Sequence, residues 1–152
     1  PFPRLTYKEV IEELHGEGFQ IEFGEDLTDL ALRRLGKIHP GFFFIKDWPA
    51  SLKPFYIDVS GELSASFDLQ YSYLELASGG RRVSERRKLE ARIRSLGLNP
   101  DGFKEHLKFF DWGMPPHSGW GFGFDRFIMV LTGRQNIREV VLYPRDALRL
   151  TP

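Results

Sequence analysis

Glycine and aromatic residues alternate without interruption from Gly119 to Phe124, and Arg126 follows two positions later. Alternate residues of a β-strand point to opposite faces, so Gly119, Gly121 and Gly123 would leave one face of a strand without side chains. A flat ring such as a nucleotide base could lie on that bare face, with Arg126 beside it. The spacing differs from the glycine fingerprint of dinucleotide-binding turns. The glycines could equally serve only to let a helix pack closely on the sheet, and this segment alone leaves both interpretations open.

Two acidic residues, Asp68 and Glu75, lie on consecutive predicted strands that are joined by a short turn. A turn of this kind could bring the two carboxylates to one place. Mg²⁺ favours sites with one or two carboxylates, in which nucleotide phosphates and water complete the octahedron. Solvated strand residues are the simpler alternative, although Glu75 has apolar neighbours, among which an unpaired buried charge would be costly. The pair is therefore a candidate metal site.

A bend of small residues at positions 78–80 delivers two arginines, Arg81 and Arg82, next to these carboxylates. The planar guanidinium group suits bidentate binding of a carboxylate or a phosphate. We assign that role to Arg82 and interpret the basic run at 86–88 as an exposed helix face. His117 directly precedes the glycine-rich strand and could face the same ligand, although a lone histidine is more often structural.

Hydrophobic spacing and capping residues predict the elements that would position these side chains. Thr6 and Glu9 form a capping box ahead of a helix over residues 7–15. Further helices are predicted over about 27–35, from Ser84 as the cap to 96, from Asn99 through about 110, and over 126–132. Strands are predicted over 42–45, 54–57, 66–71, 73–78 and 119–124, with a glycine pair at 79–80 closing the fourth.

Strands and helices follow one another without regular alternation, which favours the α+β class with an antiparallel sheet flanked by helices. A chain of 152 residues fits one domain, so we expect residues 1–152 to form a single domain. Lysine plus arginine equal aspartate plus glutamate at 21 each, so no positive field drives non-specific nucleic-acid binding, and no DNA partner is expected. The chain has no cysteine and no long apolar run. We therefore expect a cytoplasmic protein with no membrane partner.

Taken together, these segments resemble the C-terminal part of the catalytic domain of aspartyl-tRNA synthetases of the archaeal or eukaryotic type, a class II aminoacyl-tRNA synthetase family. The resemblance covers essentially the whole chain, and the glycine-rich strand corresponds to motif 3. The other matching segments are residues 1–7, Lys53-Pro54-Phe55-Tyr56, Met114-Pro115-Pro116-His117, 136–140, 143–146 and Leu150-Thr151-Pro152.

The resemblance implies ATP and Mg²⁺ as cofactors and aspartate as the amino acid. It implies that Arg126 is the motif 3 arginine that contacts ATP, and that Asp68 and Glu75 hold magnesium on the phosphates. Arg82 would pair with the side-chain carboxylate of the substrate, and Ser78 would lie near the metal and the amino acid. By the same resemblance, tRNA would be bound only by a complete synthetase.

The sequence also departs from the family at Ser72-Tyr73, Arg81 and Ser84, which bears on amino-acid specificity. Nothing in the chain resembles motif 1, motif 2 or the anticodon-binding domain, so we expect weak or no activity from the chain alone. An open sheet edge would then pair with a second copy or with a partner chain. Two alternatives stay open: a non-catalytic paralogue that binds nucleotide, amino acid or a synthetase subunit, and a small-molecule ligase of the asparagine-synthetase kind.

Overall fold

The computed structural model describes residues 1–148, so the segment Leu150-Thr151-Pro152 lies outside the described residues. Its main sheet has five strands in the order β1-β2-β5-β6-β7. Their bounds are Arg4–Thr6 (β1), Phe42–Lys46 (β2), Ser66–Tyr71 (β5), Leu74–Arg81 (β6) and Ser118–Phe122 (β7). β1 runs parallel to β2, and the other neighbours are antiparallel. A short hairpin, β3 (Val59–Ser60) with β4 (Leu63–Ser64), forms a second sheet.

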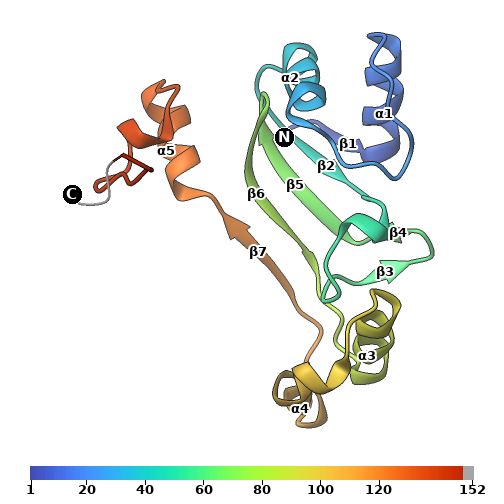
Figure 1. The fold of residues 1–152 in the computed structure, drawn as a ribbon. Helices are drawn as coiled ribbons and strands as arrows, with labels where there is room; N and C mark the ends of the chain where they lie inside the picture. The colour runs from blue at the N-terminus through green and yellow to red at the C-terminus, as the bar shows by residue number, and fades with distance from the viewer. Residues whose placement is uncertain (149–152) are drawn as a thin grey trace.

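Five α-helices accompany the sheet in the described part of the chain: α1 (Tyr7–Gly16), α2 (Asp29–Ile38), α3 (Arg86–Ser95), α4 (Lys104–Asp111) and α5 (Phe124–Thr132). Three single turns of 3₁₀ helix lie at Ala50–Leu52, Pro100–Phe103 and Ile137–Glu139. Figure 1 shows α1 and α2 beside β1 and β2, α3 and α4 at the opposite end of β6, and α5 beyond the end of β7. The arrangement confirms the predicted α+β class with a mostly antiparallel sheet.

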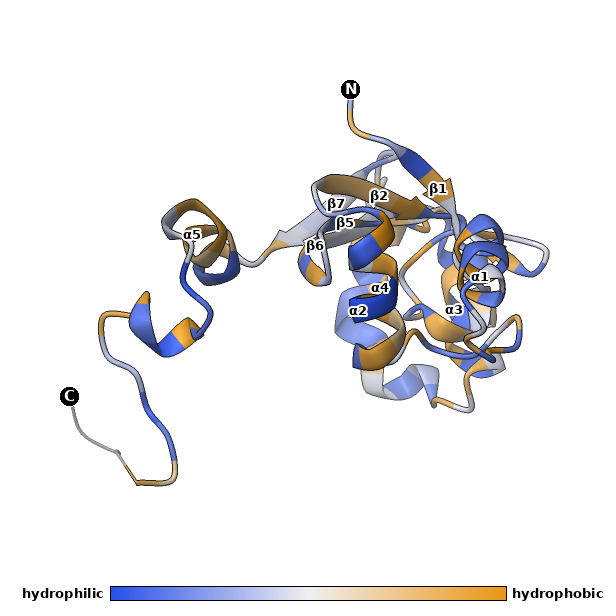
Figure 2. Cartoon of the chain, turned by 90° about the horizontal axis from the view of Figure 1, so that it is seen from above, coloured by the Kyte–Doolittle hydropathy of each residue, from blue (hydrophilic) through white to orange (hydrophobic). Residues whose placement is uncertain are grey.

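Two hydrophobic clusters hold α1 to α4 in place. The larger joins α1 and α2 to β2, where Leu14 and Leu35 pack with the buried side chains of Phe43 and Ile45. The smaller contains Val83, Leu89, Ile93 and Leu107. It fixes α3, α4 and the segment between them, residues 86–111, to the end of β6, and we call this segment the α3–α4 unit. Figure 2 shows that α5, whose apolar residues colour one side of the helix, stands away from both.

The strand register identifies the face of the sheet that carries the polar residues. Directly paired residues in neighbouring strands share a face. One such row crosses four strands and consists of Ile45, Asp68, Ser78 and Gly121. Since Ile45 belongs to the cluster with α1 and α2, these helices cover one end of this face, and the row continues beyond them onto β6 and β7. We call this the polar face.

Local sequence signals account for most of these elements. The capping box is present, because the Glu9 amide donates to Thr6 Oγ1 at 3.2 Å and the Thr6 amide donates to Glu9 Oε2 at 2.6 Å. Strand β5 has the bounds predicted from its sequence. Gly133 ends α5 in the left-handed region at φ 67°, as predicted for a helix stop. Helix α5 itself begins at Phe124, two residues before the predicted start.

Three predictions of local structure were wrong. Residues 54–57 form a turn in which the Ile57 amide donates to the Pro54 carbonyl, and only an isolated bridge joins Ile57 to Arg82. Strand β6 does not stop at the glycine pair, because both glycines pair with residues of β5 and β7 and the pairing with β7 continues to Arg81. Ser84 does not cap α3, whose N-cap is Glu85 without a side-chain hydrogen bond. The short strand β1 was not predicted.

Candidate functional site

The glycines of β7 leave an open strip on the polar face. Gly121 pairs with Ser78 and Gly119 pairs with Gly80. A Cβ atom built on Gly121 would meet nothing within 4 Å, whereas one on Gly119 would lie 3.0 Å from Arg82 Nη2. The strip is therefore free for a flat ligand at Gly121 and is bordered by a guanidinium group at Gly119.

The aromatic residues of β7 point away from this strip. Trp120 and Phe122 are 61% and 40% exposed, and their rings contact each other at 5.5 Å between centroids. Across the strand pair, a Cβ on Gly79 would stand 2.5 Å from Trp120 Cβ. Gly79 of β6 thus permits the close approach of Trp120 of the neighbouring strand, and Gly121 of β7 leaves a surface open.

Arg126 lies in the first turn of α5 and reaches back to β6. Its Nη1 donates to the backbone carbonyl of Glu75 at 2.8 Å. Its Cδ would lie 3.5 Å from a Cβ on Gly123, an ordinary van der Waals contact, so the arginine side chain passes beside that glycine. Arg126 and Glu75 line a cavity of about 730 Å³ together with Tyr73, Met129 and residues of α2. A guanidinium at the rim of such a cavity can bind phosphate oxygens.

A β-bulge brings the two candidate metal ligands to the same face. The register of β5 and β6 shifts between Leu69 and Gln70, so that Glu75 pairs with Gln70. Ser78 lies opposite Asp68, so an uninterrupted register would have paired Leu76 with Gln70 and turned Glu75 to the other face. Bulges commonly re-aim a side chain in this way. The polar face therefore holds both Asp68 and Glu75.

The two carboxylates differ in environment. Asp68 is 2% exposed, and its Oδ2 accepts from Lys53 Nζ at 2.8 Å, while Oδ1 is buried without a partner among residues 1–148. Burial, and after it the charge of Asp68, raises the pKa of Glu75. Lys53 and Arg126 oppose part of that rise. An orphaned carboxylate oxygen beside a second carboxylate is a donor set that suits Mg²⁺, which takes few protein ligands and keeps the remainder for phosphate and water. No cluster of three or more potential ligands is found within residues 1–148.

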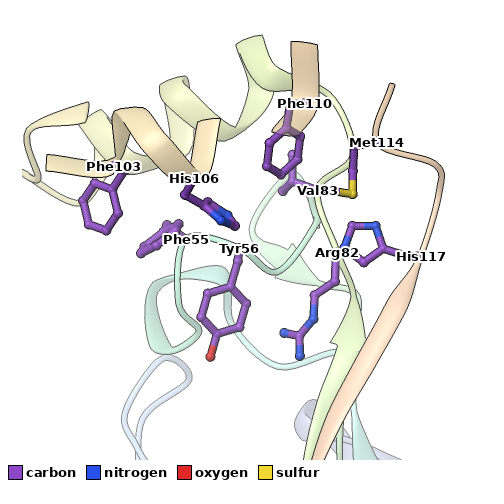
Figure 3. A pocket seen from close by; sticks show the side chains of 9 residues that line it. All are labelled: Phe55, Tyr56, Arg82, Val83, Phe103, His106, Phe110, Met114 and His117. Carbon is purple, nitrogen blue, oxygen red and sulfur yellow. The ribbon is translucent and has the colours of Figure 1, made fainter. Parts of the chain in front are cut away.

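Arg82 lies at the other end of the polar face. Its guanidinium group stacks over the ring of Tyr56 at 4.6 Å, and its backbone amide donates to the His117 carbonyl at 2.9 Å. Figure 3 shows Arg82 and Tyr56 at one side of a cavity of about 360 Å³ whose other lining residues are mainly apolar, among them Phe55, Phe103 and Phe110. His117 also lines this cavity, and its Nδ1 lies 2.9 Å from the Pro115 carbonyl oxygen.

The structure brings most of the predicted site residues onto one face. Asp68, Ser78 and Gly121 lie in one row, with Gly119 and Arg82 toward one end of β7 and Arg126 and Gly123 toward the other. His117 lies at the border of the polar face, where its backbone carbonyl accepts a hydrogen bond from the Arg82 amide. Arg81 turns away and pairs with Asp58 at 2.9 Å. Two residues that touch the site, Lys53 and Tyr56, were not assigned a role from the sequence.

Comparison of the sequence with known protein families identifies the family of this chain. A model of the tRNA synthetases class II (D, K and N) matches residues 1–147. The chain belongs to this family. It is 48% identical over its whole length to the aspartate–tRNA(Asp/Asn) ligase of Methanothermobacter thermautotrophicus, and 47% identical to that of Methanosphaera stadtmanae. It spans 36% and 35% of these relatives. The expected resemblance to class II synthetases is confirmed.

Solved synthetase structures share the fold over the entire chain. The aspartyl-tRNA synthetase from Entamoeba histolytica superposes with a TM-score of 0.93 at 36% identity, and the chain covers 33% of it. The asparaginyl-tRNA synthetase from Pyrococcus horikoshii complexed with asparaginyl-adenylate also gives 0.93, at 31% identity and with 36% of that chain covered. No helix among residues 1–148 is long and apolar enough to cross a membrane.

Proposed function

We propose that this chain supplies the motif 3 side of the active site of an aspartyl-tRNA synthetase. The observation that carries the proposal is the row of Asp68, Ser78 and Gly121 across three strands, with Arg82 at one end and Arg126 at the other. In this proposal the adenine lies on the glycine strip, Arg126 contacts the ATP phosphates, and Asp68 with Glu75 holds Mg²⁺. The chain acts in the cytoplasm.

Arg82 gives the site its amino-acid preference. A planar guanidinium fixed over Tyr56 presents its fork to a carboxylate, and aspartate carries one on its side chain. Ser78 lies between Arg82 and the metal carboxylates, next to the backbone of the substrate. Arg81, a departure from the family pattern, does not alter this pocket because Asp58 holds it on the outside.

The reaction is attack of the aspartate α-carboxylate on the α-phosphorus of ATP, which releases pyrophosphate and leaves aspartyl-adenylate. The aspartyl group then passes to the 3′ end of tRNA. The residues of this chain orient the two substrates and stabilise the negative charge that develops on the phosphate, which is how such sites gain most of their rate. When bound, Mg²⁺ would neutralise phosphate charge at Asp68 and Glu75.

The chain covers about a third of its relatives, so we propose that a further polypeptide segment completes the site. The outer edge of β7 pairs with no strand within residues 1–148, and exposed Trp120 and Phe122 lie on the same strand. A second copy of this chain, or the remainder of a synthetase, would pair with that edge. tRNA would be bound only by the completed enzyme.

Calorimetric titration with ATP and Mg²⁺ tests the nucleotide part of the proposal. Arg126→Ala and Glu75→Ala should each weaken saturable binding at least about tenfold, the loss expected for one charged contact. Arg87→Ala is the matched control, because Arg87 is equally exposed but lies on α3, away from the polar face. If all three variants bind as the unaltered chain does, the proposed site is wrong. Binding of ATP without aspartate-dependent pyrophosphate exchange, even after addition of the remaining synthetase, would favour the non-catalytic role instead.

A further inference from the structure

Lys53 occupies a largely buried position between the candidate metal ligand Asp68 and Trp48 of the hydrophobic core. Its Nζ lies 2.8 Å from Asp68 Oδ2 and 4.1 Å from the centre of the Trp48 ring. The lysine side chain is 13% exposed and the aspartate side chain 2%. Lysine is seldom this buried unless it is paired, so the position of Lys53 needs a reason beyond packing.

The backbone around Lys53 is held in place from two sides. The Lys53 amide donates to the Ala50 carbonyl at 3.3 Å, which closes the 3₁₀ turn before it. Arg92 of α3 donates through Nη2 to the carbonyls of Lys53, at 3.2 Å, and of Ala50. The ammonium group therefore extends from a fixed point, and it reaches Asp68 without needing the metal to place it.

Lys53 leaves half of the Asp68 carboxylate open. Oδ2 accepts from the lysine, whereas Oδ1 is buried and has no partner within the described residues. An aspartate this deeply buried would be costly without a counter-charge, and Glu75 adds a second negative charge on the same face. Lys53 supplies one positive charge beside Asp68, Arg126 supplies a second beside Glu75, and the open Asp68 oxygen is left for another cation.

We propose that Lys53 is the resident counter-ion of the metal site. It keeps Asp68 paired when no divalent cation is bound, and by repelling that cation it limits how tightly the site holds it. The metal would then bind firmly only together with the phosphates of a nucleotide, whose negative charge outweighs the lysine. This inference rests on the proposed function, because it takes Asp68 and Glu75 as the ligands.

The experiment measures Mn²⁺ binding, as a probe for Mg²⁺, from the electron paramagnetic resonance signal of the free ion. Lys53→Met should bind Mn²⁺ on the order of tenfold more tightly. Even at the dielectric constant of water, the repulsion between a single and a double positive charge a few ångströms apart changes a binding constant by about that factor. Lys53→Arg should stay within about twofold of the unaltered chain, because the charge is kept. Lys104→Met, on the exposed side of α4, is the matched control and should bind Mn²⁺ unchanged.

Thermal unfolding with and without Mn²⁺ gives a second readout that does not depend on activity. Lys53→Met should unfold at a lower temperature than the unaltered chain in metal-free buffer, and Mn²⁺ should raise its unfolding temperature by more. Lys53→Gln, which keeps a hydrogen-bond donor without the charge, should behave alike and serves if the methionine variant does not fold. Equal or weaker Mn²⁺ affinity in the folded variants would overturn the counter-ion role.

Asp68→Asn separates this inference from the function on which it rests. If the asparagine variant binds Mn²⁺ as tightly as the unaltered chain, the metal site itself is misplaced and the proposed function fails there. If Asp68→Asn loses Mn²⁺ while removal of the lysine charge does not tighten binding, the metal site stands and only the role of Lys53 is refuted.

Discussion

A methyl group added to Gly79 of β6 should have a different consequence from one added to Gly121 of β7. At Gly79 the new Cβ would stand 2.5 Å from Trp120 Cβ and 2.6 Å from the Gly119 carbonyl oxygen. At Gly121 it would meet nothing within 4 Å. We therefore expect Gly79→Ala to destabilise the fold and Gly121→Ala to leave the fold intact while obstructing the nucleotide.

The size of the first effect follows from the contact distance. Carbon atoms in ordinary contact are about 3.5–4.0 Å apart, so β7 would have to move away by about 1 Å or more. Overpacking of this kind costs about 1–3 kcal/mol, and weakened ladder hydrogen bonds add about 1 kcal/mol. The neighbouring atoms belong to backbone and Cβ groups that cannot rotate aside. A loss of about 3 kcal/mol lowers the unfolding temperature of a chain of this size by about 6–12 °C.

Thermal denaturation followed by circular dichroism measures the two variants side by side. Gly121→Ala should unfold within about 3 °C of the unaltered chain, since alanine in a strand is at least as favourable as glycine. Its ATP affinity should fall about tenfold, because a base held off the strip by a methyl group loses van der Waals contact with the backbone, and a loss of about 1.4 kcal/mol is a factor of ten. Equal stability of Gly79→Ala and the unaltered chain would refute the packing argument. Unchanged ATP affinity in Gly121→Ala would refute the strip as the base site.

Three further substitutions test single contacts. Because the folded chain raises the pKa of Glu75, it binds that proton more readily than the unfolded chain, so stability should rise as pH falls from neutral toward the ordinary carboxyl pKa. Glu75→Gln should abolish that rise and gain roughly 1 kcal/mol at pH 7, measured by urea unfolding across the pH range; an unchanged pH profile would contradict it. Thr6→Ala removes a capping-box oxygen and should cost about 1 kcal/mol by the same assay, whereas no loss would mean that tertiary packing alone holds α1. Arg82→Lys should weaken aspartate binding by the completed enzyme about tenfold or more in calorimetry, since lysine offers neither the bidentate fork nor the stacking on Tyr56, and full retention would argue against Arg82 as the carboxylate partner.

Local signals in the sequence were sufficient for much of the fold. The capping box at Thr6 and the glycine stop at Gly133 depend on residues within a few positions, and both are present. Strand β5 alternates polar and apolar residues, which was sufficient to predict its bounds, although the buried residues are the polar Ser66, Asp68 and Gln70. These features could be predicted because their causes lie within one turn or one strand.

Other features depend on partners that are distant in sequence. The glycine pair at 79–80 continues β6 because Gly119 and Ser66 lie opposite, which no local rule indicates. The bulge that turns Glu75 toward Asp68 leaves no mark in the residues around it. The role of Lys53 requires Asp68, which lies in another element. The predicted roles of the site residues stay predictions until the proposed substitutions are measured.

The α3–α4 unit leaves the sheet at the end of β6 and returns at the start of β7, and the backbone hydrogen bond from Arg82 to His117 closes its base. The two strands that carry Ser78 and Gly121 are thereby paired with each other directly, without help from the helices between them in sequence. Natural selection could therefore lengthen, shorten or reshape this excursion while the geometry of the polar face stays fixed. Swapping the unit between relatives would be a way to graft new surface contacts beside an unaltered polar face.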